Sequence, residues 1–81
     1  MKLEFSAQFV RAYNKAPTHV RRAFDKQSFL LQENLRHPSL RAKKYSEAED
    51  KWQARVNQGW HFYFRIVGDA YVVTDITAHP K

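Results

Sequence analysis

The sequence predicts an α+β fold in which a small antiparallel sheet packs on a two-helix hairpin, with elements in the order β-α-α-β-β-β. Three observations predict it. Apolar residues recur at helical spacing in the first half of the chain. They occupy every second position of "WQARVNQGWHFYFRI", residues 52–66, as in a half-buried strand. Turn signals containing glycine then divide the second half into strands. The 81 residues form one domain, 1–81, because so short a chain cannot build two cores.

The N-terminal segment begins with a short strand and continues into a short helix. "KLEF", residues 2–5, alternates apolar and polar side chains as a strand does. Ser6 then offers an N-cap, and Phe9, Val10 and Tyr13 recur at helical spacing. We expect this first helix to bury these three side chains.

A second helix is predicted over residues 17–35. Its proline at the start suits a first helical turn, where the missing N–H costs nothing. The stripe that faces the core follows the i, i+3, i+4, i+7 pattern and is flanked by Leu30; its residues are Val20, Ala23, Phe24, Gln27, Leu31, Asn34 and Leu35. "RHPS" ends the helix, since the residue before a proline is pushed out of helical geometry.

Residues 36–50 show no sustained periodicity and are predicted to form a connecting loop anchored by Leu40 and Tyr45. Strands are predicted at 51–56, 60–67 and 70–78. The link between the first two ends in a glycine, Gly59, for which we expect a positive φ. Gly68-Asp69 reads as a two-residue hairpin with glycine first.

The three-stranded meander has two unlike faces. The inward face carries the apolar residues Trp52, Ala54, Val56, Trp60, Phe62, Phe64 and Ile66. The outward face carries Gln53, Arg55, His61, Tyr63 and Arg65. Such a face is often simply solvated, but a solubilising surface normally mixes charge signs and this one has no carboxylate in its first two strands. The pattern therefore favours an anion-binding face, to which the basic run "RAKK" (41–44) can add.

The composition and net charge of the chain indicate which kinds of binding partner it can have. The formal charge of +6 and pI near 9.9 favour a polyanion such as nucleic acid. The absence of cysteine excludes disulfides and thiolate metal sites and is ordinary for a reducing cytosol. No signal peptide or long apolar run is present, so we expect a cytoplasmic protein with no membrane contact. No metal site and no small-molecule cofactor are predicted, since the sequence has neither ligand spacing nor a glycine-rich phosphate loop.

The outward face has the parts that metal-free RNA cleavage needs. A base must take the proton of a ribose 2′-hydroxyl, cations must stabilise the phosphorane, and an acid must protonate the leaving 5′-oxygen. Histidine titrates near neutrality and can transfer these protons, whereas arginine can only hold charge. The candidate catalytic residues are His79, His61, Arg55 and Lys81. The candidate substrate-binding residues are Arg65, Tyr63, Lys51, Gln53, Lys43 and Lys44.

The element order, the "HPSLRAKKY" connection and the tail "WQARVNQGWHFYF…YVVTDITAHPK" resemble the RelE/ParE superfamily of bacterial toxin–antitoxin systems. The resemblance implies a toxin neutralised by a small antitoxin protein. RelE-like members cut messenger RNA in the ribosomal A site, and ParE-like members inhibit DNA gyrase. Arg55 stands where RelE-like enzymes have one of two strand lysines, and Gln53 stands at the other. His61 replaces a phosphate-contacting arginine, His79 matches a C-terminal histidine, and Lys81 lies close to a terminal cationic position.

The function expected from residues and resemblance together is a ribosome-dependent messenger RNA endoribonuclease. The alternatives are a ParE-like gyrase inhibitor and a catalytically weak or silent RNA-binding homologue. An antitoxin contact is predicted on the second helix, where Phe29 lies nearly opposite the apolar stripe. The residues predicted for that contact are Phe29, Arg21, Arg22 and Lys26.

Overall fold

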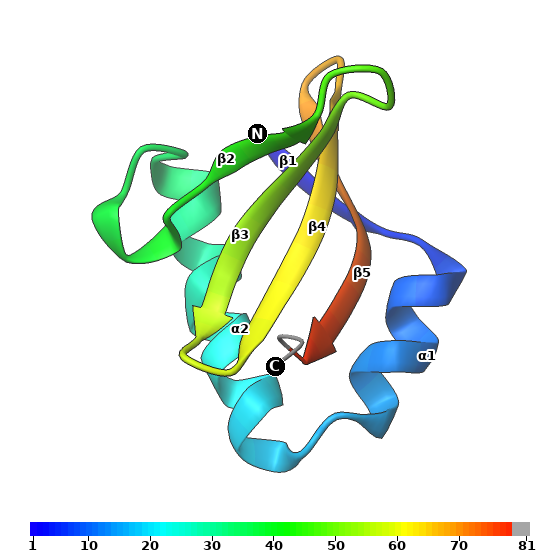
Figure 1. Ribbon diagram of the computed structural model, residues 1–81, viewed down its shortest axis with the longest axis vertical. Helices are drawn as coiled ribbons and strands as arrows, with labels where there is room; N and C mark the ends of the chain where they lie inside the picture. Colours follow the sequence, from blue (N-terminus) through cyan, green and yellow to red (C-terminus); the bar gives the residue numbers. More distant parts are fainter. Residues whose placement is uncertain (79–81) are drawn as a thin grey trace.

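One five-stranded sheet, in the order β1-β5-β4-β3-β2, organises residues 1–78, the part of the chain that the computed structural model describes (Figure 1). Its strands are β1 (Lys2–Phe5), β2 (Lys43–Ser46), β3 (Lys51–Asn57), β4 (Trp60–Val67) and β5 (Ala70–Ala78). The helices are α1 (Ala7–Lys15), α2 (Thr18–Glu33) and the 3₁₀ helix η1 (Pro38–Leu40). The predicted α+β class, both helices and the β3-β4-β5 meander are confirmed. Within residues 1–78, no helix combines the length and the apolar character needed to span a membrane.

The sheet is mixed rather than purely antiparallel. Strand β1 pairs in parallel with β5, with Lys2 opposite Ala70 and Phe5 opposite Val73. A parallel pair needs a long crossover connection, and the segment between β1 and β5 contains both helices. The periodicity of "KLEF" predicts a strand but does not indicate which strand it pairs with. The parallel orientation of β1 and β5 therefore depends on the tertiary fold.

The predicted loop over residues 36–50 is wrong in part, because it contains η1 and β2. Strand β2 pairs antiparallel with β3, and Lys43 and Lys44 lie opposite Gln53 and Trp52. Four residues are too few for a readable period, and lysines on an edge strand discourage pairing with other chains. Leu40 is fully buried as predicted.

The two glycine turns differ. Gly68 has a φ of 60°, which confirms the two-residue hairpin with glycine first. Gly59 does not have a positive φ, so that prediction is wrong. Strand β3 instead continues to Asn57, with an irregular register after Arg55. The Asn57 Oδ1 accepts a 2.8 Å hydrogen bond from the Gly59 N–H, which closes the turn without a left-handed residue.

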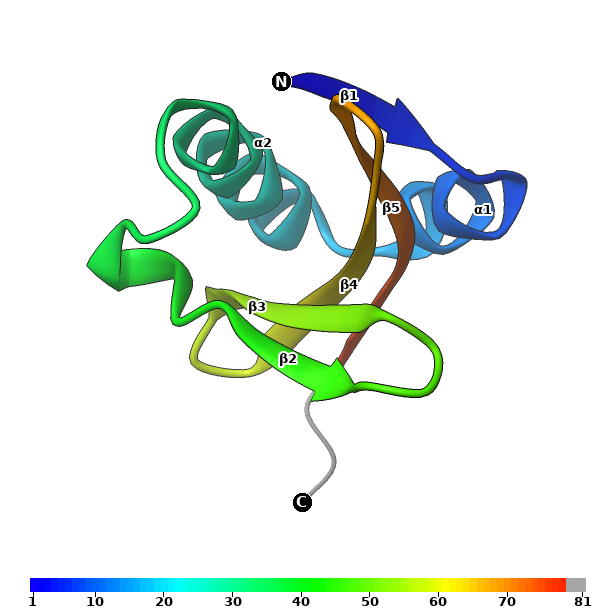
Figure 2. The same ribbon diagram turned by 90° about the horizontal axis from the view of Figure 1, so that it is seen from above.

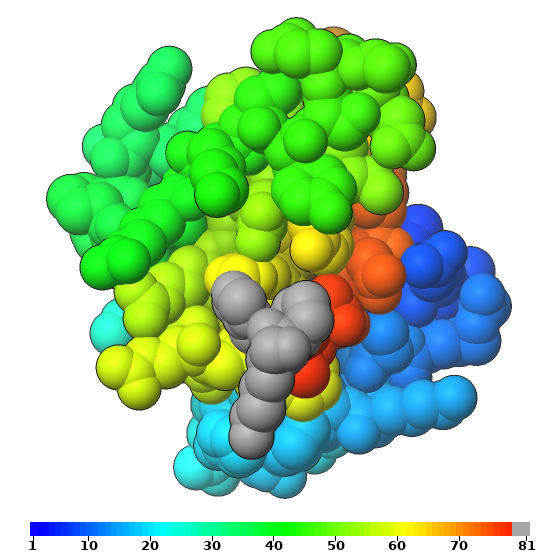
Figure 3. Space-filling view, in the orientation of Figure 1, coloured from blue at the N-terminus to red at the C-terminus, as the bar shows by residue number. Residues whose placement is uncertain are grey.

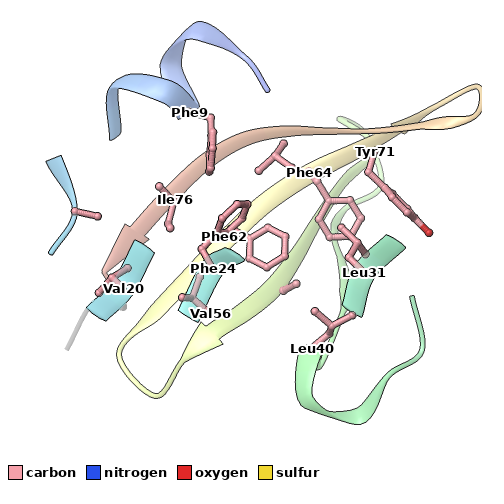
Figure 4. Close-up of a cluster of buried hydrophobic side chains, with 13 residues drawn as sticks. Phe9, Val20, Phe24, Leu31, Leu40, Val56, Phe62, Phe64, Tyr71 and Ile76 are labelled. Atoms are coloured by element: carbon pink, nitrogen blue, oxygen red, sulfur yellow. The ribbon is translucent and has the colours of Figure 1, made fainter. Parts of the chain in front are cut away.

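The core lies between the inner face of the sheet and the two helices (Figure 4). Helix α2 packs against β3 and β4, whereas α1 lies along β5 (Figure 2). The Phe24 ring lies 4.9 Å from that of Phe9 and 5.1 Å from that of Phe62, so both helices and β4 share one aromatic cluster. The predicted inward residues are buried or partly buried against this cluster: Trp52, Ala54, Val56, Trp60, Phe62, Phe64 and Ile66.

Three residues predicted to be buried are exposed. Asn34 is exposed because α2 ends at Glu33, and Asn34 is its C-cap instead of part of the stripe. Val10 is 44% exposed, because Phe9 and Tyr13 occupy the stripe of α1 that faces the core. Tyr45 is 57% exposed, because it lies in β2 on the face away from the helices. Its ring contacts that of Tyr63 on the outer face instead.

A buried amide joins three elements. Gln27 on α2 is only 6% exposed. Its Nε2 donates to the carbonyl oxygens of Ser39 (3.0 Å) and Arg55 (2.8 Å), and its Oε1 accepts from the Ser39 hydroxyl (3.0 Å). The side chain thus ties α2 to the end of η1 and to the middle of β3.

Replacing Gln27 by leucine is expected to lower the free energy of unfolding by about 1–3 kcal/mol, since two carbonyls and a hydroxyl lose their buried partner. The measurement is a urea unfolding curve. Gln32→Leu, at an exposed position of the same helix, is the matched control and should change the free energy by less than about 0.5 kcal/mol. Equal unfolding midpoints for the two variants would contradict the role assigned to Gln27.

Candidate functional site

The outer face of the sheet, turned away from α2, gathers the polar side chains of β2, β3 and β4. Lys43 lies opposite Gln53, which lies opposite Tyr63, and Arg55 lies opposite His61. Figure 3 views this face, where residues of β2 (green), β4 (yellow) and β5 (orange to red) are at the surface. The predicted grouping of Gln53, Arg55, His61 and Tyr63 on one face is therefore present.

A hollow of about 370 Å³ lies at the β3–β4 turn end of this face; we call it the catalytic hollow, after the role that we propose for it. Its lining combines three cations, one imidazole and two amides: Arg41, Lys43, Arg55, His61, Gln53 and Gln58, with Ala54. Within residues 1–78, no carboxylate lines it. Such a lining attracts an anion, because nothing in it offsets the positive charge.

His61 is oriented by its neighbour across the strands. The Gln53 Nε2 lies 2.8 Å from the His61 Nδ1, so the amide donates to that ring nitrogen. With the amide nitrogen of Gln53 as the donor, Nδ1 accepts, and the neutral imidazole then carries its proton on Nε2. Gln53 thereby fixes the plane of the ring against the sheet.

Arg41 and Arg55 reach the catalytic hollow from backbone positions that the Gln27 amide holds. The Arg55 carbonyl accepts from Gln27, and its own Nε donates to the Asn57 carbonyl at 3.3 Å. Arg41 follows η1 in a left-handed conformation, with a φ of 47°, two residues after the Ser39 that Gln27 also binds. One buried side chain thus fixes the separation of the two guanidinium-bearing segments.

Tyr63 continues the outer face beyond the catalytic hollow. The Tyr45 ring lies 5.3 Å from it in an edge-on arrangement, and the Lys51 ammonium lies 5.6 Å from the centre of the Tyr63 ring. Burial raises the pKa of the Tyr63 phenol above its ordinary value, and Tyr45 and Asp75 raise it further. Tyr63 therefore stays protonated at neutral pH and can stack or donate a hydrogen bond, but cannot serve as a base.

Three predicted substrate-binding cations do not line the catalytic hollow, namely Lys44, Lys51 and Arg65. Lys44 points to the other side of β2, where its ammonium binds the Asp50 carboxylate and lies 5.4 Å from the centre of the Trp52 ring. The hydrogen bond from Lys44 holds the pKa of the Asp50 carboxyl below its usual range, with a smaller contribution from the charge of Arg65. Arg65 lines a different hollow, of about 400 Å³, together with Lys51 and Asp75.

The other described histidines, His19 and His37, do not line the catalytic hollow. His79 and Lys81 lie outside the described residues. His19 is exposed near the start of α2. His37 caps η1, and its Nδ1 accepts from the Ser39 N–H at 3.2 Å. Among residues 1–78, no three side chains of metal-binding type gather closely enough to hold an ion.

The sequence did not point to Tyr45 or Gln58 on this face, and it pointed to Arg41 only as one residue of the basic run 41–44. The basic run at 41–44 signals cations near the sheet, but it does not reveal that Arg41 and Lys43 line the catalytic hollow while Lys44 does not. The sequence predicts Tyr45 to be a buried residue that anchors the loop over residues 36–50. Its role on the outer face follows only from the pairing of β2 with β3.

The predicted antitoxin contact lies on α2, on the side away from the core. Phe29 is 62% exposed, and Arg22 and Lys26 share its stripe at helical spacing. Arg21 differs from them, because its guanidinium donates to the Ala16 carbonyl at 2.6 Å and to the Thr18 hydroxyl at 3.1 Å. Arg21 thus secures the link between α1 and α2.

Solved toxin structures superpose on nearly the whole chain at low sequence identity. A YoeB/ParE toxin from Agrobacterium tumefaciens has a TM-score of 0.81 at 13% identity, covering 99% of this chain and 100% of that one. The RelE–RelB complex from Methanococcus jannaschii has a TM-score of 0.77 at 18% identity, over 93% and 88% of the two chains. The YoeB dimer from Staphylococcus aureus has a TM-score of 0.79 at 12% identity, over 99% and 98%. No protein-family model and no curated protein sequence matches the chain. The RelE/ParE-type fold implied by the resemblance is thus confirmed.

The protonation of Tyr63 can be measured directly. The difference in ultraviolet absorbance between the wild-type protein and Tyr63→Phe, followed with pH, isolates the ionisation of this phenol. Its midpoint is expected above the ordinary tyrosine value of about 10, because burial disfavours the phenolate. A midpoint at or below that value would show that the ring is more solvated than its position between Tyr45 and the sheet indicates.

Proposed function

We propose that this chain is the toxin of a type II toxin–antitoxin system, and that it acts in the cytoplasm as a ribosome-dependent messenger RNA endoribonuclease. One observation supports this best. The chain has the fold of RelE- and YoeB-type toxins. On this fold, His61, which the Gln53 amide orients, lines the same hollow as three cations. No carboxylate from residues 1–78 lines that hollow. That combination suits a phosphodiester whose charge increases during the reaction.

The proposed reaction needs no metal. The ribose 2′-hydroxyl attacks the adjacent phosphorus and gives its proton to a base, for which His79 remains the candidate. The bond from phosphorus to the 5′-oxygen breaks, which leaves a 2′,3′-cyclic phosphate and a 5′-hydroxyl. His61 in its imidazolium form donates the Nε2 proton to the leaving 5′-oxygen. Arg41, Lys43 and Arg55 stabilise the negative charge of the phosphorane.

Gln53 suits His61 in both of its protonation states. Its amide donates to Nδ1 of the neutral ring. When the amide rotates by half a turn, its oxygen accepts from the Nδ1–H of the imidazolium instead. Gln53 cannot act as a base, so its proposed role is to hold the His61 ring in place while the proton moves. Tyr63, with Lys51 beside it, offers a surface on which an unpaired base can stack.

The proposed protein partner is a small antitoxin. The RelE–RelB complex of Methanococcus jannaschii and the RelBE and DinJ–YafQ complexes of E. coli, which share the fold, are toxin–antitoxin complexes. In this chain, exposed Phe29 with Arg22 and Lys26 beside it offers an apolar anchor within a basic surface. An acidic antitoxin segment with an apolar pocket would complement it.

Replacing His61 by alanine is expected to lower the rate of messenger RNA cleavage by about 100-fold or more, since one proton transfer loses its residue. The assay is cleavage of a translated transcript in a purified translation system, mapped by primer extension. His19→Ala, which removes an exposed imidazole that does not line the hollow, is the matched control and should cleave like the wild type.

Two results of this assay would contradict the proposed chemistry. Intact transcripts together with blocked DNA supercoiling by gyrase would identify a gyrase inhibitor. RNA binding that survives the loss of both His61 and His79, without any product, would identify a non-catalytic RNA-binding protein.

Phe29→Asp is expected to abolish co-purification with the product of the neighbouring antitoxin gene, because it places a carboxylate where an apolar pocket and an acidic segment meet the toxin. Affinity purification of the co-expressed pair measures it. Val67→Asp, at another exposed apolar position that lies in β4 instead of α2, is the control and should leave the complex intact. Retention of the complex by both variants would rule out this surface.

A further inference from the structure

A second hollow lies beside the catalytic one, between α2, η1 and the β3–β4 turn. It has a volume of about 630 Å³ and is called the basic groove below. Lys26, His37, Arg41 and Arg55 line it, and no carboxylate from residues 1–78 does so. Like the catalytic hollow, it therefore presents a positive surface with no offsetting negative charge.

The basic groove is continuous with the catalytic hollow. Arg41, Arg55 and Gln58 line both of them. The two arginines thus stand at the boundary, where each can face a phosphate on either side. A nucleic-acid strand that leaves the catalytic hollow across this boundary enters the basic groove next.

The other groups of the groove suit a sugar–phosphate backbone. The His37 Nδ1 accepts from the Ser39 N–H, so the neutral ring carries its proton on Nε2 as a donor. Lys26 is exposed on α2 and supplies a mobile ammonium. Ala23 and Val56 form small apolar parts of the lining, which can contact the edge of a sugar or a base.

We propose that the basic groove binds phosphates of the RNA strand adjacent to the cleaved bond, so that the enzyme holds several nucleotides of single strand rather than one phosphodiester. This inference rests on the proposed ribonuclease function and extends it. An acidic protein segment is a weaker fit, because Phe29, the exposed apolar anchor of α2, does not line the groove. Continuity with the catalytic hollow favours the RNA strand.

The test measures binding of uncleavable 2′-O-methyl RNA by fluorescence anisotropy at several salt concentrations. A dinucleotide is compared with an oligomer of about eight nucleotides, a length within the usual range of single-strand sites. Lys26→Ala removes a charge from the groove, and Lys15→Ala, at an exposed position at the end of α1, removes the same charge elsewhere. Both side chains lie at the surface, so both variants should fold.

Lys26→Ala is expected to weaken binding of the longer oligomer about fourfold at physiological salt and to reduce the salt slope by about 0.7, the effect of one lost phosphate contact. Binding of the dinucleotide should not change, and Lys15→Ala should leave both affinities as in the wild type. Equal behaviour of Lys26→Ala and Lys15→Ala, or an equal loss for both RNA lengths, would overturn the inference. Loss of antitoxin binding with unchanged RNA binding would overturn it in favour of a protein partner.

The RNA used in the binding experiment cannot be cut. The result of that experiment is therefore independent of the result of the cleavage assay. If His61→Ala abolishes cleavage while Lys26→Ala binds RNA like the wild type, the proposed function stands and the groove inference fails. If binding of the longer oligomer depends on Lys26 but no RNA is cut, the groove still binds RNA and the ribonuclease function fails.

Discussion

The hydrogen bonds of the Gln27 amide are the constraint on which the candidate site depends. A buried amide is costly unless its hydrogen bonds are made, and here one side chain binds two carbonyls and a hydroxyl. These partners belong to η1 and β3, which follow α2 along the chain. Because the Gln27 amide binds both the Arg55 carbonyl and the segment before Arg41, it limits how far the backbones of these two residues can move apart. A fully satisfied buried network of this kind makes a site rigid.

The aromatic core allows the outer face to carry unpaired positive charge. Like charges close together on a sheet destabilise it, and this chain has no disulfide to offset that cost. The stability comes instead from large rings on the inner face, where Phe9, Phe24 and Phe62 contact one another. In β3 and β4, residues that face the core alternate with residues of the outer face, so the same strands can carry both. The functional face is therefore supported by the same strands that build the core.

Charge is distributed unevenly along the outer face. Toward the β2–β3 turn, Asp50 and Asp75 lie near Arg65, so positive charge there is largely offset. Around the β3–β4 turn, the cations of the catalytic hollow and basic groove face no carboxylate from residues 1–78. An anion is therefore drawn toward one end of the sheet. The net charge of +6 by itself gives no such direction.

The sequence by itself determined the two helices, the β3-β4-β5 meander and which residues of β3 and β4 face inward, because these follow from local periodicity and turn chemistry. It also grouped Gln53, Arg55 and His61, since a short turn fixes their register. Only the tertiary structure decided that β1 runs parallel to β5, that β2 joins the sheet, and that Arg41 reaches the catalytic hollow while Lys44 does not. These features depend on pairing between distant segments and on the buried Gln27 amide, which no local pattern encodes.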